Sequence, residues 1–394
     1  MAPIRVLVVD DSVVIRKVLC EALAGDPEIE IAGSAPDGSI ALSKIGLLKP
    51  DVVTLDVEMP VMSGIETLTE IRKINPTLPV IMFSTLTERG ATTTLDALAL
   101  GASDYLTKPH GTGSLEETRI RIQRELIPKV KALCQMARAT PEKTPSPVAK
   151  GVQPPAISRM RTNAPDGRVD VVVIGTSTGG PNALSTVLPG IAKDFPVPIV
   201  IVQHMPPLFT RLLADRLQKQ SAIRIREGQP GAVLNAGEAW IAPGDFHMTV
   251  RREEKAVKLA MNQEAPENSC RPAVDVLFRS AARVYGPHAL GVVLTGMGSD
   301  GTLGAKQMKS AGAQILVQDE ATSVVWGMPG TVAAAGLADG IFALEEIAGE
   351  LERRVWMFRT KDERKESAKQ ELVRAGTERE RTDVSALSAA RERQ

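Results

Sequence analysis

The chain has 394 residues, a formal net charge of zero and an apolar content of 43%, which predict a globular protein of two or three domains. A neutral chain without a basic helix-turn-helix segment disfavours nucleic-acid binding. No apolar run approaches the ~20 residues of a membrane span, and the N-terminus MAPIRVLVVDD lacks the apolar core of a signal peptide. The three cysteines are too widely spaced for a disulfide framework or a zinc site. We therefore expect a cytoplasmic protein that inserts into no membrane.

Residues 4 to about 123 alternate between short apolar runs and stretches with helical apolar spacing. The expected strands are Ile4–Val9, Ile29–Gly33, Val52–Leu55, Val80–Phe83 and Tyr105–Thr107. Helical spacing covers Val13–Leu23 and Ile40–Leu48, with further helical stretches between the later strands. This alternation predicts a five-stranded parallel, doubly wound sheet, in which a ligand site lies at the carboxyl ends of the strands.

Polar residues follow these strands at the end where the site is expected. Asp10 and Asp11 follow the first strand, Asp56 the third, Ser84 the fourth and Lys108 the fifth. One aspartate at such a place would be read as a helix cap, but the five positions together indicate a site. Converging carboxylates repel unless a cation lies among them, and hard oxygen ligands favour Mg²⁺.

The segments VLVVDDS, LDVEMPVMSG and YLTKP, together with Ser84, resemble the receiver domain of two-component response regulators, which has a flavodoxin-like fold. The resemblance implies that Asp56 accepts a phosphoryl group from a histidine kinase and, with Asp11 and the assistance of Asp10, holds Mg²⁺. It further implies that Ser84 and Tyr105 are the switch pair and that Lys108 contacts the phosphoryl oxygens. We expect the receiver to occupy residues 1–123.

A helical extension and a linker are expected next, over residues 124–167. Leu126, Val130 and Leu133 share one face of a helix from about 124 to 138. From Thr140 onward prolines recur among Lys, Ser, Thr and Arg, which is typical of a semi-extended linker.

A second α/β domain is expected over residues 168–358, and it opens with VVVIGTSTGGP. Val171–Ile174 reads as a buried strand, and Gly175 to Gly179 as a tight turn into a helix that starts near Pro181. Ser177 between glycines matches G-x-S-x-G, a nucleophile turn. The alternative for this motif alone is a phosphate-binding or structural glycine turn. Further strands are expected at Ile199–Val202, Glu238–Ala242, Leu290–Leu294 and Ile315–Val317, with a hairpin insertion within 223–259.

Ser177, His204 and Asp300 each follow one of these strands by a few residues. On neighbouring parallel strands they would meet as nucleophile, general base and orienting carboxylate. The chain order Ser, His, Asp differs from the Ser, acid, His order of the α/β-hydrolases. We therefore expect a Rossmann-like α/β domain and not the α/β-hydrolase fold. His247 remains a competitor to His204, and Asp319 is the next candidate for the acid.

The motifs GTSTGGP, QHMPP, IAPGDFHM, RPAVDVLF, LTGMGSDG and VVWGMPG resemble the catalytic domain of the chemotaxis protein-glutamate methylesterases, the CheB family. The resemblance implies hydrolysis of glutamate γ-methyl esters, and deamidation of particular glutamines, on methyl-accepting chemoreceptors. It implies that Ser177 attacks, His204 transfers protons, Asp300 holds the imidazole and the Met297 backbone N–H contributes to the oxyanion hole. It also implies that the receiver covers this site until Asp56 is phosphorylated, and that catalysis needs no cofactor beyond the receiver's Mg²⁺.

Residues 359–394 lie outside the resemblance, and their mixed charges predict a disordered tail or a loose helix. Two other functions stay open. One is a phosphorylation-switched binding module with a catalytically silent esterase-like domain. The other is a serine esterase that acts on another protein or on a small ester.

Overall fold

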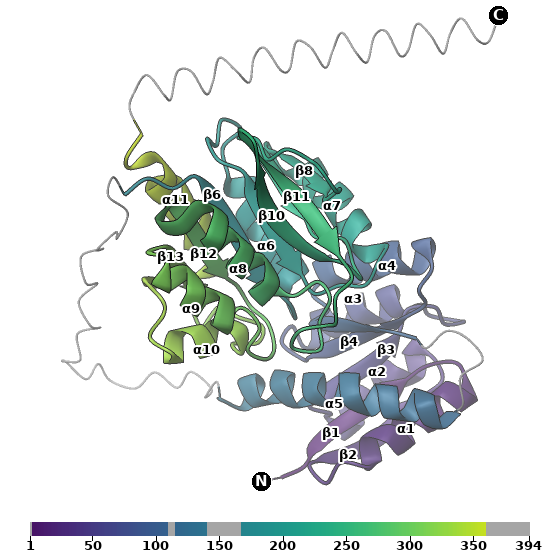
Figure 1. Cartoon of the computed structure of the whole chain (residues 1–394). Helices are drawn as coiled ribbons and strands as arrows, with labels where there is room; N and C mark the ends of the chain where they lie inside the picture. Colours follow the sequence, from purple (N-terminus) through teal and green to yellow (C-terminus); the bar gives the residue numbers. More distant parts are fainter. Residues whose placement is uncertain (1, 109–114, 140–166, 360–394) are drawn as a thin grey trace, which may run out of the picture.

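The computed structural model describes residues 2–108, 115–139 and 167–359, which form two α/β units (Figure 1). Most of the predicted linker and nearly all of the predicted C-terminal tail lie outside these described residues.

The first unit is a parallel sheet in the order β2-β1-β3-β4-β5. Its strands are β1 (Ile4–Val9), β2 (Ile29–Ala35), β3 (Val52–Asp56), β4 (Val80–Ser84) and β5 (Asp104–Thr107). Its helices are α1 (Val13–Ala24), α2 (Gly38–Leu48), α3 (Gly64–Ile74), α4 (Glu88–Ala99) and α5 (Leu115–Ala139). Helices α1 and α5 pack together on one face, whereas α2, α3 and α4 cover the other (Figure 1). The expected five-stranded parallel sheet is confirmed.

Helix α5 is longer than the sequence predicted. The apolar face of residues 124–138 indicated a separate extension, but the helix begins at Leu115 and runs without interruption to Ala139. Leu126 and Val130 are fully buried in the core beneath α1 and α5. The extension is therefore the second half of the last helix of the first unit.

The second unit is a seven-stranded parallel sheet in the order β14-β13-β12-β6-β7-β9-β8. Its strands are β6 (Val171–Thr176), β7 (Ile199–Gln203), β8 (Arg224–Glu227), β9 (Glu238–Ile241), β12 (Ala289–Val293), β13 (Gln314–Gln318) and β14 (Gly340–Phe342). Its helices are α6 (Gly180–Val187), α7 (Phe209–Gln220), α8 (Val274–Tyr285), α9 (Thr302–Ser310), α10 (Met328–Ala334) and α11 (Leu344–Trp356), with short 3-10 turns η1 (Leu188–Gly190) and η2 (Gly286–His288). Helices α8, α9 and α10 pack on one face, and α6, α7 and α11 on the other.

A hairpin lies outside the large sheet. Strands β10 (His247–Glu253) and β11 (Ala256–Asn262) pair antiparallel and pack against α8 (Figure 1). The predicted hairpin is therefore present, but it covers 247–262, whereas β8 and β9, in the earlier part of the predicted 223–259 segment, belong to the large sheet. Among the described residues, no helix is both long and apolar enough to cross a bilayer.

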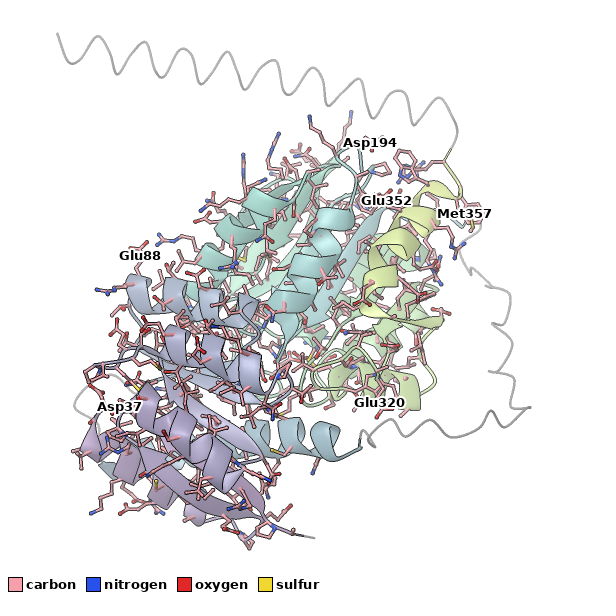
Figure 2. The ribbon with its side chains drawn as sticks, turned by 180° about the vertical axis from the view of Figure 1, so that it is seen from behind. Asp37, Glu88, Asp194, Glu320, Glu352 and Met357 are labelled. Carbon is pink, nitrogen blue, oxygen red and sulfur yellow. The ribbon has the colours of Figure 1, made fainter. Side chains whose placement is uncertain are left out.

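The two units pack against each other. One buried apolar cluster continues from the face of α2, α3 and α4 to the face of α6, α7 and α11. Helix α4 contacts both α6 and α7. Glu88 at the start of α4, labelled in the rear view of Figure 2, pairs with Arg211 of α7 at 3.1 Å. The carboxyl ends of β6, β7 and β12, three adjacent strands, lie near this junction and carry the site described below.

Candidate active site

Ser177 lies in a sharp turn between β6 and α6. Gly179 has a positive φ of 77°, a conformation that glycine adopts without steric cost, and the chain turns there into the helix. The Ser177 N–H donates to Thr295 O at 3.0 Å. A Cβ added to Gly296 would lie 2.9 Å from Ser177 Cβ, so the segment that follows β12 packs directly on the serine and requires glycine there.

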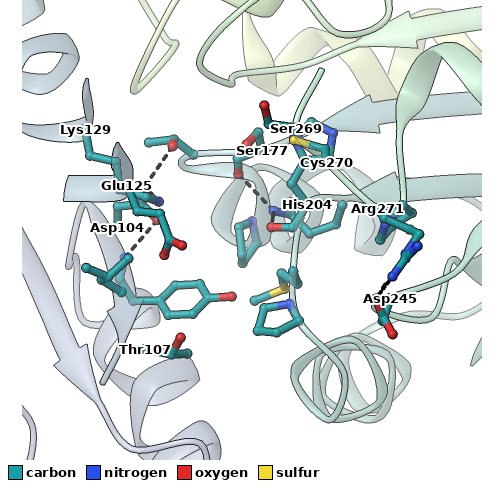
Figure 3. Close-up of a pocket in the computed structure, with 18 of the residues that line it drawn as sticks. Asp104, Thr107, Glu125, Lys129, Ser177, His204, Asp245, Ser269, Cys270 and Arg271 are labelled. Atoms are coloured by element: carbon teal, nitrogen blue, oxygen red, sulfur yellow. Dashed lines mark hydrogen bonds and ion pairs between the residues drawn. The ribbon is translucent and has the colours of Figure 1, made fainter. Parts of the chain in front are cut away.

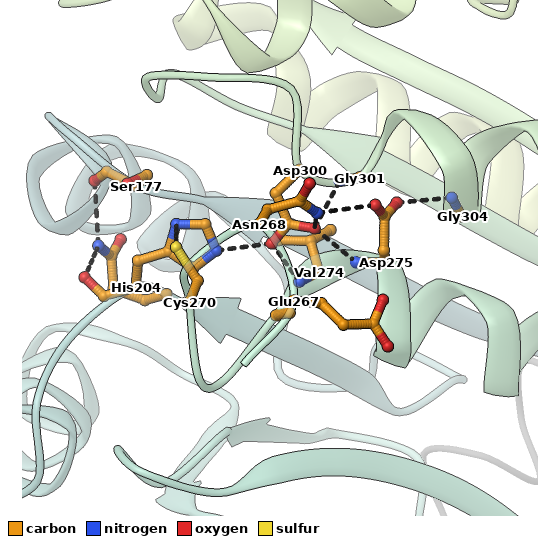
Figure 4. A network of polar contacts seen from close by, with 12 residues as sticks. Ser177, His204, Glu267, Asn268, Cys270, Val274, Asp275, Asp300, Gly301 and Gly304 are labelled. Carbon is orange, nitrogen blue, oxygen red and sulfur yellow. Dashed lines mark hydrogen bonds and ion pairs between the residues drawn. The ribbon is translucent and has the colours of Figure 1, made fainter. Parts of the chain in front are cut away.

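His204 and Asp300 form a hydrogen-bonded pair beside this turn. Nε2 of His204 lies 2.8 Å from Oδ2 of Asp300. The Asp300 carboxylate also accepts backbone N–H donors from Val274 at 2.7 Å and Asp275 at 3.0 Å, both in the first turn of α8. Figure 4 shows the imidazole between Ser177 and Asp300. A helix N-terminus favours a negative charge, so this arrangement keeps Asp300 ionised.

The hydrogen bond between His204 and Asp300 raises the pKa of the histidine and lowers the pKa of the aspartate. Burial lowers the pKa of His204, but its hydrogen bonds to Asp300 and Cys270 outweigh burial and raise it above the usual value. Burial raises the pKa of Asp300, but the bond and charge of His204 and the backbone donors bring it below its usual value. The protonated imidazole is therefore stabilised, as a proton-accepting base requires.

The other ring nitrogen of His204, Nδ1, faces Cys270, whose Sγ lies at 3.5 Å. Among the described residues, no hydrogen bond joins Ser177 Oγ to the imidazole. Because Asp300 holds Nε2, Nδ1 is the nitrogen left to take a proton. Cys270 belongs to the loop between β11 and α8, and Asn268 of the same loop donates to Asp300 Oδ1 at 2.9 Å.

The alternative candidates for the base and the acid, His247 and Asp319, make hydrogen bonds that stabilise their own loops. His247 starts β10, where its Nδ1 accepts from the Ala273 N–H at 3.2 Å and its Nε2 lies 3.1 Å from Ala265 O. Asp319 caps its own turn by accepting from the Thr322 N–H at 3.0 Å. The structure thus brings together Ser177, His204 and Asp300, and places His247 and Asp319 elsewhere.

Met297 lies in the segment that packs on Ser177. Its side chain packs against a buried cluster formed mostly by the first unit. Within the described part of the chain its backbone N–H has no hydrogen-bond acceptor, which leaves that donor open.

A cavity of about 450 Å³ opens between the two units, and both units line it. Figure 3 shows Ser177, His204 and Cys270 on one wall, and Asp104, Glu125 and Lys129 of the first unit opposite them. The Thr178 hydroxyl, next to Ser177, donates to Asp104 Oδ2 at 2.7 Å. The first unit therefore reaches the residue adjacent to the serine.

Two further contacts join the units at the same junction. The Tyr105 ring stacks on Phe209 of α7 with ring centroids 4.8 Å apart and an interplanar angle of 10°. Arg216 of α7 pairs with Asp96 of α4 at 2.6 Å. The buried Tyr105 hydroxyl has a pKa well above its usual value, chiefly because of burial, so the ring is neutral.

The predicted phosphoacceptor site is a compact carboxylate cluster. One oxygen each of Asp10, Asp11 and Asp56 lies within 4.8 Å of the others. Lys108 Nζ lies 2.6 Å from Asp56 Oδ2 and 3.0 Å from Asp10 Oδ2. Burial, aided by the Asp10 charge and opposed by Lys108, raises the pKa of Asp56 to about 6. Three hard oxygen donors with excess negative charge suit Mg²⁺.

Ser84 lies at the end of β4, next to Asp56 on β3. Its hydroxyl donates to Gly90 O of α4 at 3.1 Å. It is therefore engaged with the first turn of α4, the helix that contacts the second unit.

Several residues at the site cannot be recognised from the sequence alone. Gln203, which lines the cavity, lies within QHMPP, and nothing in that motif distinguishes it from its neighbours. Asp104, Thr178 and Asn268 have partners that are distant in sequence, and only their three-dimensional contacts reveal them.

Two family models match the chain: "CheB methylesterase" over residues 172–351 and "Response regulator receiver domain" over residues 6–119. A protein-glutamate methylesterase/protein-glutamine glutaminase from Trichodesmium erythraeum is 49% identical over 90% of this chain and 100% of its own length. The chain belongs to the CheB methylesterase family. A CheB relative with the same description from Nocardioides sp. is also 49% identical, over 90% of this chain and 96% of its own.

Two solved CheB structures from Thermotoga maritima are also similar. The methylesterase catalytic domain is 41% identical and covers 47% of this chain and 98% of its own, with a TM-score of 0.46. The response regulator domain is 47% identical and covers 34% of this chain and 97% of its own, with a TM-score of 0.31. As a CheB-family member the chain is a methylesterase with a response-regulator domain, and therefore a hydrolase of the chemotaxis system.

Proposed function

We propose that this chain hydrolyses glutamate γ-methyl esters, and deamidates specific glutamines, on methyl-accepting chemoreceptors in the cytoplasm, and that phosphorylation of Asp56 activates it. The observation that carries the chemistry is His204, hydrogen-bonded to a buried Asp300 and next to the Ser177 turn. The curated relatives' names supply the substrate class.

In this mechanism Ser177 Oγ attacks the ester carbonyl, and its proton passes to His204. The tetrahedral intermediate collapses when the C–O bond to methoxide breaks, and His204 protonates methoxide to methanol. Water, deprotonated by His204, then attacks the acyl-enzyme ester and releases glutamate and the serine. For a glutamine the first leaving group is ammonia. No cofactor takes part in these steps.

The Met297 backbone N–H is the proposed oxyanion donor. Its segment packs on Ser177, and the donor has no acceptor among the described residues. One such donor lowers the barrier by about 3 kcal/mol.

The proposed switch begins at Asp56, whose carboxylate oxygen attacks the phosphorus of a phosphohistidine on the chemotaxis kinase while the P–N bond breaks and the kinase imidazole leaves. Asp10, Asp11 and Asp56 would hold Mg²⁺, which neutralises charge on the phosphoryl group. Lys108 is already bonded to Asp56 and would pair with a phosphoryl oxygen. The phosphoryl group carries nearly two negative charges in place of the single charge of the Asp56 carboxylate, and Ser84, whose hydroxyl now bonds to α4, would turn toward them.

The proposed output is the opening of the interface between the units. Asp104 and Tyr105 are neighbours on β5 and contact Thr178 and Phe209 of the catalytic unit. Movement of Tyr105 and α4 would break the stack and release the Thr178 hydroxyl. Substrate would then reach the cavity that the receiver now lines. We assign residues 1–123 to the receiver, 124–139 to its helical extension, which is the second half of α5, 140–167 to the linker, 168–358 to the catalytic domain and 359–394 to the tail.

The proposed chemistry predicts that Ser177→Ala eliminates methanol release from methylated receptor membranes, a loss of about 10⁵–10⁶-fold in kcat. The reason is that the Ser177 hydroxyl oxygen forms the acyl intermediate in the proposed mechanism. Ser269→Ala is the matched control, since Ser269 lines the same cavity, and it should retain activity. Circular dichroism would check that both variants fold.

Normal methanol release by Ser177→Ala would refute the proposed nucleophile. A fluorophosphonate probe separates the remaining possibilities. Labelling of Ser177 without methanol release would indicate an esterase with another substrate. Absence of both would indicate a silent binding module.

A further inference from the structure

One side chain bonds to the backbones of both the nucleophile and the base. Gln203 is the last residue of β7 and pairs across the sheet with Thr176, the residue before Ser177. Its Nε2 donates to Ser177 O at 3.0 Å and to His204 O at 3.2 Å. Both hydrogens of one amide thus hold two turns from different strands.

The same amide also has one buried polar atom that is left without a hydrogen bond. Gln203 is 2% exposed, and among the described residues its Oε1 has no hydrogen-bond partner. A buried acceptor without a partner is destabilising. Gly180, at the start of α6, leaves room for the amide, because a Cβ added there would lie 2.0 Å from Gln203 Oε1. The unsatisfied Oε1 therefore offsets part of the stability that the two donated hydrogen bonds supply.

We infer that Gln203 is a positioning residue that fixes the distance between Ser177 and His204. Proton transfer needs the two groups within about 2.6–3.2 Å, and a displacement of 1 Å can reduce the rate about 100-fold. The backbone hydrogen bond from His204 N to Thr176 O at 3.2 Å joins the same two strands, but it lies one residue before Ser177. The inference rests on the proposed roles of Ser177 and His204.

The first test is Gln203→Met in the full-length protein, activated with a small-molecule phosphodonor and Mg²⁺. Methionine has similar length and no donors. We expect kcat for methanol release to fall about 10–100-fold. KM should stay within about twofold, because the amide hydrogens bond to carbonyls of the protein and are not available to bind substrate. Gln314→Met is the matched control, because the Gln314 amide is also buried but accepts a hydrogen bond from Arg354. Gln314 is the first residue of β13, and the site lies at the other, carboxyl ends of the strands. The Gln314→Met variant should lose stability in a thermal melt without losing kcat.

The second test is the pH profile of Gln203→Glu. A protonated carboxyl can donate to one of the two carbonyls, whereas a carboxylate repels both. Activity relative to wild type should therefore fall at least about tenfold as the new group ionises with rising pH. A purely structural role predicts a fall in activity only at pH values where circular dichroism shows that the variant unfolds.

A kcat for Gln203→Met equal to that of Gln314→Met, or a constant ratio for Gln203→Glu, would overturn the inference. If the wild-type protein releases no methanol, the proposed function fails, and the rate of fluorophosphonate labelling at Ser177 then tests Gln203 independently. Slower labelling of Gln203→Met supports the positioning role, and an equal rate overturns it.

Discussion

At the scale of single residues, Asp300 illustrates what the sequence could and could not predict. Its place after a buried strand, within LTGMGSDG, predicted that it would lie near His204. The donors that keep it ionised come from Val274 and Asp275, at the start of a helix about 25 residues earlier. Similarly, the sequence favoured His204 but left His247 as a competitor, since both were expected to follow strands. The partners of His247, Ala265 O and Ala273 N–H, become visible only in three dimensions.

The bond between His204 and Asp300 predicts the pH dependence of kcat/KM. The proposed mechanism requires neutral His204, and the hydrogen bond to Asp300 raises the pKa of His204. Activity should therefore be lost as pH falls, with a midpoint above the value of about 6.5 for a free histidine. In Asp300→Asn the charge is absent, so the midpoint should move to lower pH and kcat should fall by about 10⁴. An unchanged midpoint in pH–rate profiles of the variant would contradict this role.

At the scale of elements, strand ends carried most of the predictive information. A run of apolar β-formers followed by a polar residue marks the carboxyl end of a parallel strand, and that edge is where Asp56, Ser84 and Lys108 lie. The start of α5 was not predicted, because the apolar face of residues 124–138 gave no indication of where the helix begins. The partner surface of β5 was also missed, because it depends on docking against α7, on a different unit.

Strand β5 contacts Thr178, the residue next to the proposed nucleophile, and this leads to a prediction about Asp104. Asp104→Asn weakens its bond with Thr178 and removes its ion pair with Lys129. Losing about 1–1.5 kcal/mol of interface energy should raise methanol release without phosphodonor about 5–10-fold. The rate with phosphodonor should not change, because the interface is then already open.

The control for this experiment is Asp96→Asn, which breaks a more exposed pair with Arg216 at the rim of the same interface. It should raise the unstimulated rate by less than Asp104→Asn. Equal unstimulated rates in wild type and Asp104→Asn would show that β5 does not restrain the catalytic unit.

At the scale of the whole molecule, one apolar cluster runs from the receiver into the catalytic unit. Each unit's fold follows from its own alternation of strands and helices, so the sequence could predict both. The way the units dock does not follow from these local patterns, because Tyr105 and Phe209 are about a hundred positions apart and either could equally face its own core. The resemblance to CheB proteins implied that the receiver covers the site, and the structure adds the residues that make contact.

The most direct test of the account is methanol release from methylated receptor membranes, measured with and without a small-molecule phosphodonor plus Mg²⁺, in wild type and in Asp56→Ala. The account predicts that release by the wild-type protein rises with phosphodonor, that omitting Mg²⁺ abolishes the rise, and that Asp56→Ala stays at the unstimulated rate. If the wild-type protein releases methanol at the same rate with and without phosphodonor, the proposed switch is wrong. If no methanol is released in any condition, the proposed chemistry is wrong.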